Sequence, residues 1–243
     1  MENNEDNLIQ MLGTNITVEE INNIYGKENI KQGKTKLFNH FFITYIIGCN
    51  ITKDIEKFEG KIICIIQIKE KNDVRIVVSD KNSKMTYSEI KGWFRDIEEL
   101  SNANFNCLYE KSAGVITYKK INNKIKYLIV YSKINFPGFP KGHVEYKETE
   151  EEAAKREVFE EVGIKVNLKS NFRESLSYIV YDTPIHKEVV FFLAEISEKD
   201  KINIDTNEIN KFEFVNLDEA QNILNQELID ILKNTEEYIK NNT

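Results

Sequence analysis

The segment TEEEAAKREVFEEVG, residues 149–163, constrains the fold of this chain more than any other stretch. Thr149 and Glu152 have the spacing of a capping box, in which two side chains satisfy the free amides at the start of a helix. Gly163 stands where a left-handed residue commonly ends one. The segment therefore predicts a helix of about four turns with a defined beginning and end. Its apolar residues lie mostly on one side, where they can face a core: Ala153, Val158 and Val162, with Ala154 beside them.

Three glutamates share another stripe of this helix, because Glu157 precedes Glu160 and Glu161 by three and four residues. Like charges at this spacing destabilise an isolated helix by roughly 0.2–0.5 kcal/mol per pair, and a helix C-terminus also disfavours anions. Arg156 offsets part of this repulsion, and a divalent cation that prefers oxygen ligands, Mg²⁺ or Mn²⁺, would offset more. From the spacing alone a solvated acidic face is the simpler interpretation, and a metal site is the alternative.

The pattern continues towards the N-terminus as far as Gly142, and this longer register favours the metal site. The sequence GHVEYKETEEEAAKREVFEEVGI fits G-x5-E-x7-R-E-U-x-E-E-x-G-U, with U aliphatic, at all nine fixed positions: Gly142, Glu148, Arg156, Glu157, Val158, Glu160, Glu161, Gly163 and Ile164. This pattern resembles the signature of Nudix hydrolases, and the resemblance extends over about residues 111–235. It implies an α/β/α sandwich around a mixed sheet, a loop–helix–loop that holds Mg²⁺ or Mn²⁺, and hydrolysis of nucleoside diphosphates linked to another group.

The resemblance assigns a role to each charged residue of this box. Glu160 and Glu161 are expected to be metal ligands, and Glu157 a ligand, a general base, or both. Glu148 would assist or orient the metal cluster, and Arg156 would hold the glutamates by ion pairs. Bound metal ions neutralise pyrophosphate oxygens and lower the pKa of an attacking water. These five residues are the predicted catalytic set.

Three further segments resemble the asymmetrical diadenosine tetraphosphate hydrolases within this family: GFPKGHVE, LAEI and TNEINKFEFVNLDEA. On this resemblance Lys141, Gly142 and His143 bind substrate beside the phosphates. Tyr178 would lie near the base-binding surface, and Glu208 would be a fourth carboxylate for the metals. Simpler roles stay open for two of these residues: His143 could order its loop, and Glu208 could be an ordinary surface residue.

The N-terminal part of the chain predicts a separate, β-rich unit. Runs of β-branched and aromatic residues at 41–48, 61–69 and 74–79 have the length of strands, and residues 86–103 carry a capping box and an apolar helical face. The predicted division is a disordered tail over residues 1–10, a small mainly-β domain with one or two helices over 11–110, and a Nudix domain over 111–243.

Residues 55–79, together with the predicted helix that begins TYSEI, resemble the C-terminal half of the barrel of a soluble inorganic pyrophosphatase. Such barrels bind several Mg²⁺ ions through aspartates on neighbouring strands, whereas the corresponding stretch here, NHFFITYIIG, contains none. The resemblance therefore implies an inactive domain with a structural role. We expect it to serve as a dimer interface, a lid over the Nudix cleft or a ligand sensor, and a homodimer is compatible with these roles.

Composition limits the location and partners of the chain. The net charge of −7 argues against a broad surface for nucleic-acid backbones. The three cysteines are widely spaced and include no CxxC pair, which predicts reduced thiols in a cytoplasmic protein. The acidic N-terminus lacks the features of a signal peptide, and the longest apolar run, residues 41–49, is too short to span a membrane.

The sequence as a whole predicts a Mg²⁺-dependent (or Mn²⁺-dependent) pyrophosphohydrolase that acts on a nucleotide, with dinucleoside polyphosphates as the first substrate class. Removal of phosphates from the 5′ end of RNA is an alternative that the acidic balance disfavours. Hydrolysis of ADP-ribose or of oxidised dNTPs are two more. A non-catalytic nucleotide-binding regulator is a fourth alternative, but the intact box argues against it because inert relatives typically lose a glutamate.

Overall fold

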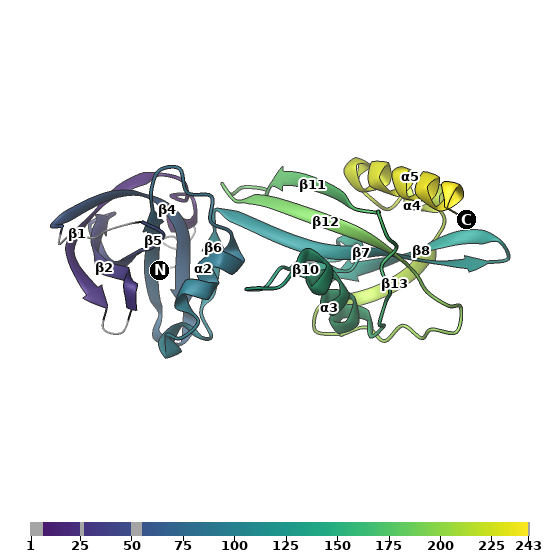
Figure 1. The fold of residues 1–243 in the computed structure, drawn as a ribbon, viewed down its shortest axis with the longest axis horizontal. Coiled ribbons are helices and arrows are strands. Elements are labelled where there is room, and N and C mark those ends of the chain that lie inside the picture. Colours follow the sequence, from purple (N-terminus) through teal and green to yellow (C-terminus); the bar gives the residue numbers. More distant parts are fainter. Residues whose placement is uncertain (1–6, 25–26, 50–54, 243) are drawn as a thin grey trace. The chain divides into compact units, whose positions relative to one another are not determined.

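The computed structural model of the chain describes residues 7–24, 27–49 and 55–242. It divides into two compact units, and many of their helices and strands are labelled in Figure 1. The first unit comprises Met1–Glu110 and Tyr178–Lys187, and the second comprises Lys111–Ser177 and Glu188–Thr243. The predicted division differs from this at one place, because Tyr178–Lys187 group with the first unit rather than with the rest of the C-terminal half.

The first unit is built around a closed sheet. Its elements are β1 (Asn15–Ile24), β2 (Lys27–Leu37), β3 (His40–Ile46), β4 (Lys57–Ile68), η1 (Lys69–Lys71), β5 (Asp73–Ser79), α2 (Tyr87–Phe94), η2 (Glu98–Leu100) and β6 (Asn104–Cys107). The strand order is β1-β2-β3-β5-β4-β6, and an additional β1–β4 pairing closes the first five strands into a barrel. With β3 and β5 parallel, this is the arrangement of an OB-fold barrel.

Strand β4 shows why the isoleucine-rich run at 61–69 forms the centre of this unit. Ile62 and Ile65 pack into one buried cluster, whereas Ile63 and Ile66 pack into a second cluster that includes helix α2. All four side chains are fully buried. A continuous apolar run is what a strand covered on both faces requires.

Two expectations for the N-terminal part need correction. Leu8 is 1% exposed and packs in the same cluster as Ile62, so the tail predicted over 1–10 is ordered in its described part, residues 7–10; residues 1–6 lie outside the described residues. The helix predicted over 86–103 ends at Phe94, and Ile97 is extended before the short η2 turn. The apolar spacing that predicted one helix is produced by a helix followed by a turn that covers the same core.

The segment Tyr178–Lys187 groups with the first unit because of specific contacts. Ile185 is 7% exposed and packs in the cluster that contains Leu8. The amide of His186 donates to the carbonyl of Leu108 at 2.8 Å, and the two rings of His186 and Tyr109 stack at 5.3 Å.

The second unit is a sheet covered on both faces. Its elements are β7 (Tyr109–Ile121), β8 (Lys124–Ser132), β9 (Pro137–Gly138), β10 (Lys141–His143), α3 (Glu150–Val162), β11 (Glu174–Ile179), β12 (His186–Glu195), β13 (Ile209–Val215), α4 (Leu217–Ala220) and α5 (Gln226–Asn241). The strand order is β11-β12-β7-β8-β13, with β10 beside β7 and β9 beside β8. Figure 1 shows α3 and α5 on opposite sides of this sheet.

Alternation along the strands builds a separate core for each helix. In β8, Tyr127 and Ile129 pack with α5, whereas Leu128 and Val130 pack with α3. The residues Ala153, Ala154, Val158 and Val162 supply the α3 side of its core, as their spacing predicted. The second unit therefore has the predicted α/β/α layers, and the predicted fold class is confirmed.

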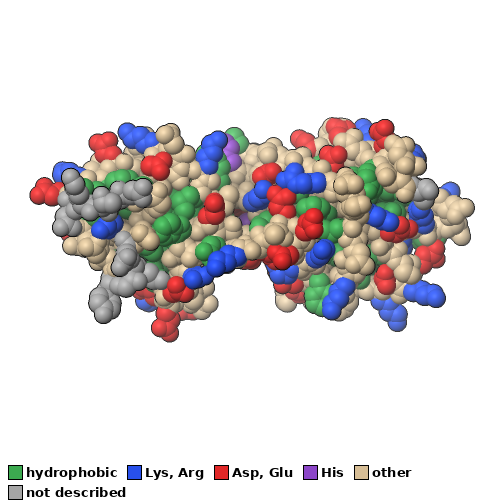
Figure 2. Space-filling model, viewed as in Figure 1, with side chains coloured by type: hydrophobic (Ala, Val, Ile, Leu, Met, Phe, Trp, Pro, Cys, Tyr) green, Lys and Arg blue, Asp and Glu red, His purple; other side chains and the backbone are tan. Residues whose placement is uncertain are grey.

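Charged side chains of both signs lie on the face of the molecule drawn in Figure 2. On the face drawn in Figure 2, basic and acidic groups are interspersed over both units. Within the described ranges, no helix combines the length and the apolar character that a membrane crossing requires.

Candidate active site

Helix α3 begins and ends as its sequence requires. The Thr149 hydroxyl accepts a hydrogen bond from the Glu152 amide at 3.2 Å, and the Glu152 carboxylate accepts one from the Thr149 amide at 2.9 Å. At the other end, Gly163 has a φ of 74°, and its amide donates to the Phe159 carbonyl at 3.0 Å. The capping box predicted for this helix is confirmed, and the helix presents its glutamates in a fixed register.

Arg156 is the centre of the polar network on this helix. Its guanidinium binds both oxygens of Glu148 at 2.9 Å and donates to Glu157 at 2.6 Å and to Glu160 at 2.9 Å. It also donates to the backbone carbonyl of His143 at 2.8 Å. Although burial opposes the effect, these hydrogen bonds lower the pKa of Glu148. The network thus joins the loop before α3 to the helix itself.

Two glutamates of the box are less well compensated. Glu157 and Glu161 are each only 8% exposed. Burial raises the pKa of Glu157 despite its bond to Arg156, and the charges of Glu160 and Glu208 add to the effect. Burial also raises the pKa of Glu161 to about 8; Lys141 opposes this shift, while Glu157 and Glu208 reinforce it. Carboxylates that are both desolvated and mutually repelling are stabilised by a nearby cation.

A glycine makes room for the Glu157 carboxylate. A Cβ built on Gly142 would lie 2.1 Å from the Glu157 Cδ and 2.2 Å from each of its oxygens. Strand β10 in turn lies close against β7, where a Cβ on Gly114 would lie 2.3 Å from the Pro140 carbonyl oxygen. The amide of Lys141, beside Gly142, donates to Glu161 at 3.2 Å. The backbone of β10 therefore forms one wall of the acidic site.

The loop that carries Glu208 is fastened to the end of α3. The amides of Asn203 and Asp205 donate to the carbonyls of Val162 and Glu161, at 3.0 and 2.9 Å. The Glu208 amide donates to the Asp205 carbonyl at 3.2 Å, which closes a turn. Glu208 is exposed and acts electrostatically on both Glu157 and Glu161, as noted above. The structure thus brings this residue to the box, although Glu208 is 44 positions beyond Ile164 in the sequence.

The remaining predicted site residues fall into two groups. Lys141 and His143 lie on β10, half-buried, in the same unit as the box. Tyr178 is grouped with the first unit and is 43% exposed. Partial burial together with the charge of Glu110 raises the pKa of its hydroxyl. The second unit therefore contains every predicted site residue except Tyr178.

Sequence reasoning missed residues that support the site. Asp205 orders the Glu208 turn, since its carboxylate accepts from the Asn207 amide at 2.9 Å. Asp and Asn favour turns, so Asp205 and Asn207 in the sequence DTN are a local signal for this one. Glu150, at the start of α3, is held by Lys111 at 2.5 Å and by Arg173 at 2.8 Å, through residues far apart in the sequence that carry no local signal.

The carboxylates of the box are not preassembled as a metal site, although their chemistry suits a divalent metal. Among residues 7–24, 27–49 and 55–242, no three His, Cys, Asp or Glu side chains converge as a ready-made metal group. The reason is visible in the network, because Arg156 engages oxygens of Glu148, Glu157 and Glu160. The chemistry of the donors still fits a hard cation, since carboxylate oxygens are the ligands that Mg²⁺ and Mn²⁺ prefer and two of these carboxylates lack full compensation.

The layered unit with its capped acidic helix, arginine centre and glycine wall has the architecture of a Nudix domain. A family model for the NUDIX domain matches residues 110–234, just over half of the chain. The chain therefore belongs to the NUDIX family. The prediction of a Nudix hydrolase is confirmed at this level, and residues 1–109 precede the matched region.

The chain is also similar to individual nucleotide pyrophosphohydrolases. The asymmetrical bis(5′-nucleosyl)-tetraphosphatase of Sus scrofa is 32% identical over 121 residues, which are 45% of this chain and 81% of that protein. An RNA pyrophosphohydrolase of Hydrogenovibrio crunogenus is 32% identical over 88 residues, 31% of this chain and 53% of that protein. Among solved structures, a binary complex of C. elegans Ap4A hydrolase matches 54% of this chain and 98% of its own, with 26% identity and a TM-score of 0.51. The predicted resemblance to asymmetrical diadenosine tetraphosphate hydrolases is confirmed as a similarity.

Proposed function

We propose that the chain is a divalent-metal-dependent pyrophosphohydrolase that cleaves a phosphoanhydride bond in a nucleoside diphosphate derivative, with dinucleoside polyphosphates as its substrate class. The observation that carries this proposal is the pair of buried, under-compensated carboxylates, Glu157 and Glu161, set against the ordered arginine network of a Nudix helix. The substrate class is supported by the tetraphosphatase relatives and by the Ap4A hydrolase structure.

Four carboxylates would hold the metal: Glu157, Glu160, Glu161 and Glu208. When bound, Mg²⁺ or Mn²⁺ would neutralise phosphate oxygens and acidify a water. Residues of the chain would hold these carboxylates in position. Arg156 orients three glutamates, and Glu148 fixes the guanidinium from the loop side through two hydrogen bonds.

Substrate contacts are expected beside this carboxylate set. The Lys141 side chain, whose charge already acts on Glu161, would bind phosphate oxygens. Gly142 keeps the β10 backbone close to Glu157, and His143 would contact the same phosphates. Tyr178 remains the proposed contact for a base, on the strength of the sequence resemblance.

The experiment that tests the proposal uses purified full-length chain, Mg²⁺ or Mn²⁺, and a panel of nucleotides, with products identified by mass spectrometry. The panel includes diadenosine tetraphosphate, ADP-ribose and an oxidised dNTP. We expect ATP and AMP from diadenosine tetraphosphate, and no product when the metal is chelated. A chain that hydrolyses none of the panel with either metal would contradict the enzyme proposal.

A second candidate is the removal of pyrophosphate from the 5′ end of RNA, which the similarity to an RNA pyrophosphohydrolase supports. The net charge of −7 argues against a long RNA-binding surface, as do the mixed charges on the one face drawn in Figure 2, though neither argues against binding of a single 5′ end. A short triphosphorylated RNA added to the panel separates the two candidates. The substrate class is the one, RNA or dinucleoside polyphosphate, for which kcat/KM is higher.

A further inference from the structure

Two cysteines of the first unit face each other across neighbouring strands. Cys64 in β4 is paired in register with Cys107 in β6, and the strands are antiparallel. The Leu108 amide donates to the Ile63 carbonyl at 2.9 Å, which makes 63–108 a hydrogen-bonded position and 64–107 a non-hydrogen-bonded one. Side chains at such positions are closest, with Cα atoms about 4.5 Å apart.

The two sulfur atoms are within contact distance. Cys64 Sγ and Cys107 Sγ are 3.0 Å apart, and both cysteines are free thiols. Disulfides form where Cα atoms are about 4.4–6.8 Å apart, so a bond between these two sulfurs requires little movement of the backbone. Cys49, the third thiol, has other contacts: its sulfur lies 3.4 Å from the Ile47 carbonyl and 3.8 Å from the Ser79 hydroxyl.

The pair is buried, so its chemistry depends on opening of the structure. Both cysteines are 0% exposed, within the core that also contains Phe94 and Phe105. Burial raises the pKa of the Cys64 thiol, which makes the closed state a poor nucleophile. Strand β6 is a four-residue strand at the end of the sheet order, however, and parts of a fold can open locally at a lower free energy than global unfolding requires.

We propose that Cys64 and Cys107 are a redox pair that oxidises to an intramolecular disulfide when the chain meets a low-molecular-weight disulfide. In the first step a cysteine thiolate of the opened pair attacks a sulfur of the oxidant, forms a mixed disulfide and releases one small thiolate. The second cysteine then attacks the protein sulfur of that mixed disulfide and releases the second small thiol. In total, two protein thiols and one small disulfide give one protein disulfide and two small thiols.

The bond would act as a covalent staple in the first unit. It would close a loop of chain that contains β5, α2, η2 and β6. The closed loop would have lower conformational entropy in the unfolded state, which would stabilise the folded first unit. It would also fix the start of β7, because Leu108 and then Tyr109, the first residue of β7, follow Cys107. This property belongs to the first unit and does not depend on the proposed hydrolase activity.

The test compares full-length chain incubated with glutathione disulfide and with a reducing thiol, at a temperature where circular dichroism shows the folded state. Free thiols are then alkylated in denaturant, and the digested protein is analysed by mass spectrometry. We expect a Cys64–Cys107 linked peptide, about 2 Da lighter than the two reduced peptides, with Cys49 alkylated. We also expect the oxidised chain to melt about 10 °C higher, and the shift to reverse on reduction.

Variants make the outcome specific. Cys49→Ala should keep both the linked peptide and the melting shift, whereas Cys64→Ala and Cys107→Ala should each lose both. Because the two pair variants leave a small cavity, Cys64→Val is included as a better-filled version that also has no thiol. Alkylation of all three cysteines after oxidation of the wild type would overturn the proposal, as would a linked peptide that contains Cys49.

Discussion

Each unit of the molecule contains an arginine surrounded by acidic side chains, and the two clusters differ in how fully the arginine compensates them. In the first unit Arg75, 6% exposed, donates to Asp73 at 3.0 Å and also to Glu99 and the Tyr45 hydroxyl. Its hydrogen bond lowers the pKa of Glu99. In the second unit Arg156 engages three glutamates, yet the pKa of buried Glu157 is still raised.

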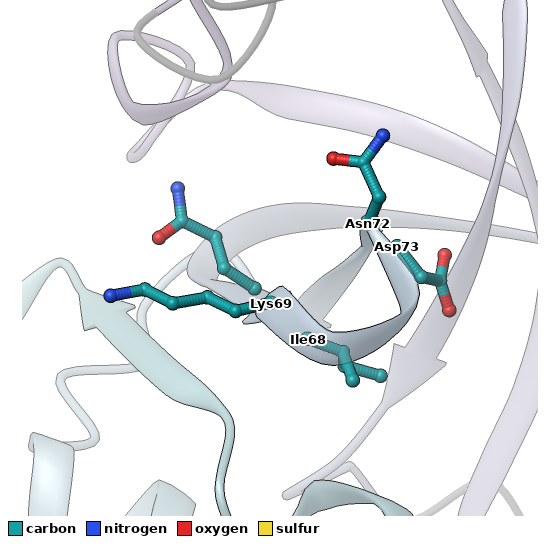
Figure 3. A pocket seen from close by; sticks show the side chains of 5 residues that line it. Ile68, Lys69, Asn72 and Asp73 are labelled. Atoms are coloured by element: carbon teal, nitrogen blue, oxygen red, sulfur yellow. The ribbon is translucent and has the colours of Figure 1, made fainter.

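The two clusters also differ in how the side chains around each arginine are arranged. Beside Arg75, the turn between β4 and β5 encloses only a small recess of about 140 Å³, and the side chains labelled in Figure 3 diverge from one another. Beside Arg156, the carboxylates of Glu157 and Glu161 are buried close to a glycine-lined strand. A compensated cluster stabilises a fold, whereas under-compensated carboxylates in a confined place are characteristic of a functional site.

The largest expected effect distinguishes the clusters by activity. Glu160→Gln removes a carboxylate charge from the proposed metal set, and we expect kcat/KM for the hydrolysed nucleotide to fall by about 10³-fold. Glu99→Gln makes the same chemical change in the Arg75 cluster and should leave kcat/KM unchanged. Near-normal activity of Glu160→Gln would remove the metal-ligand assignment, and equal losses in both variants would erase the distinction between the clusters.

The reciprocal experiment distinguishes them by stability. Arg75→Met removes the guanidinium from Asp73 and the Tyr45 hydroxyl and leaves Glu99 paired with Lys71 alone. We expect the free energy of unfolding of the first unit to fall by about 2 kcal/mol in urea titrations. Arg156→Met should lower the free energy of unfolding less, because protonation or a bound metal can relieve part of the repulsion between the carboxylates that Arg156 contacts. The same variant should reduce activity strongly. The opposite ranking would show that Arg156 is the structural arginine.

Two glycines give a finer test of the site. Gly142→Ala places a methyl group within 2.2 Å of the Glu157 carboxylate, and displacement of that carboxylate should lower kcat/KM by about 10²-fold. Gly138→Ala is the matched control, since its added Cβ meets nothing within 4 Å. We expect Gly138→Ala to retain activity and both variants to show wild-type circular dichroism. Full activity of Gly142→Ala would mean that Glu157 need not lie against β10.

The helix that carries the box was predictable because its information is local, whereas the metal-binding roles of its glutamates were assigned by the family resemblance. The cap, the glycine stop and the spacing of the glutamates all lie within residues 149–163, and one helical period converts them into geometry. The role of Glu208 could come only from family resemblance, since what brings it close is backbone bonding of Asn203 and Asp205 to the end of α3.

The rest of the fold depends on pairings between distant residues. Closure of the barrel by β1 and β4, and the packing of Ile185 in the first unit, are tertiary choices that no local period encodes. The Arg75 cluster is another case, because it joins Tyr45, Asp73 and Glu99 from three elements. Sequence patterns predict which strands exist and which faces are apolar, but not which apolar face meets which.

The smallest expected effect concerns a third, fully compensated carboxylate, Glu150. Hydrogen bonding from Arg173, assisted by Lys111, lowers its pKa to about 2, below the usual value near 4.3 for glutamate. Because the folded-state pKa is depressed, the stabilisation is complete above about pH 5 and is lost as the pH falls towards 2. Glu150→Gln should therefore lower the free energy of unfolding by about 1–2 kcal/mol at pH 7 and by almost nothing near pH 2. Glu151→Gln, at the next and exposed position of α3, is the control and should show no such pH-dependent difference. If Glu150→Gln cost the same stability at both pH values, the ion pairs of Glu150 would not be its source, and compensation by arginine would no longer separate structural from functional carboxylates in this chain.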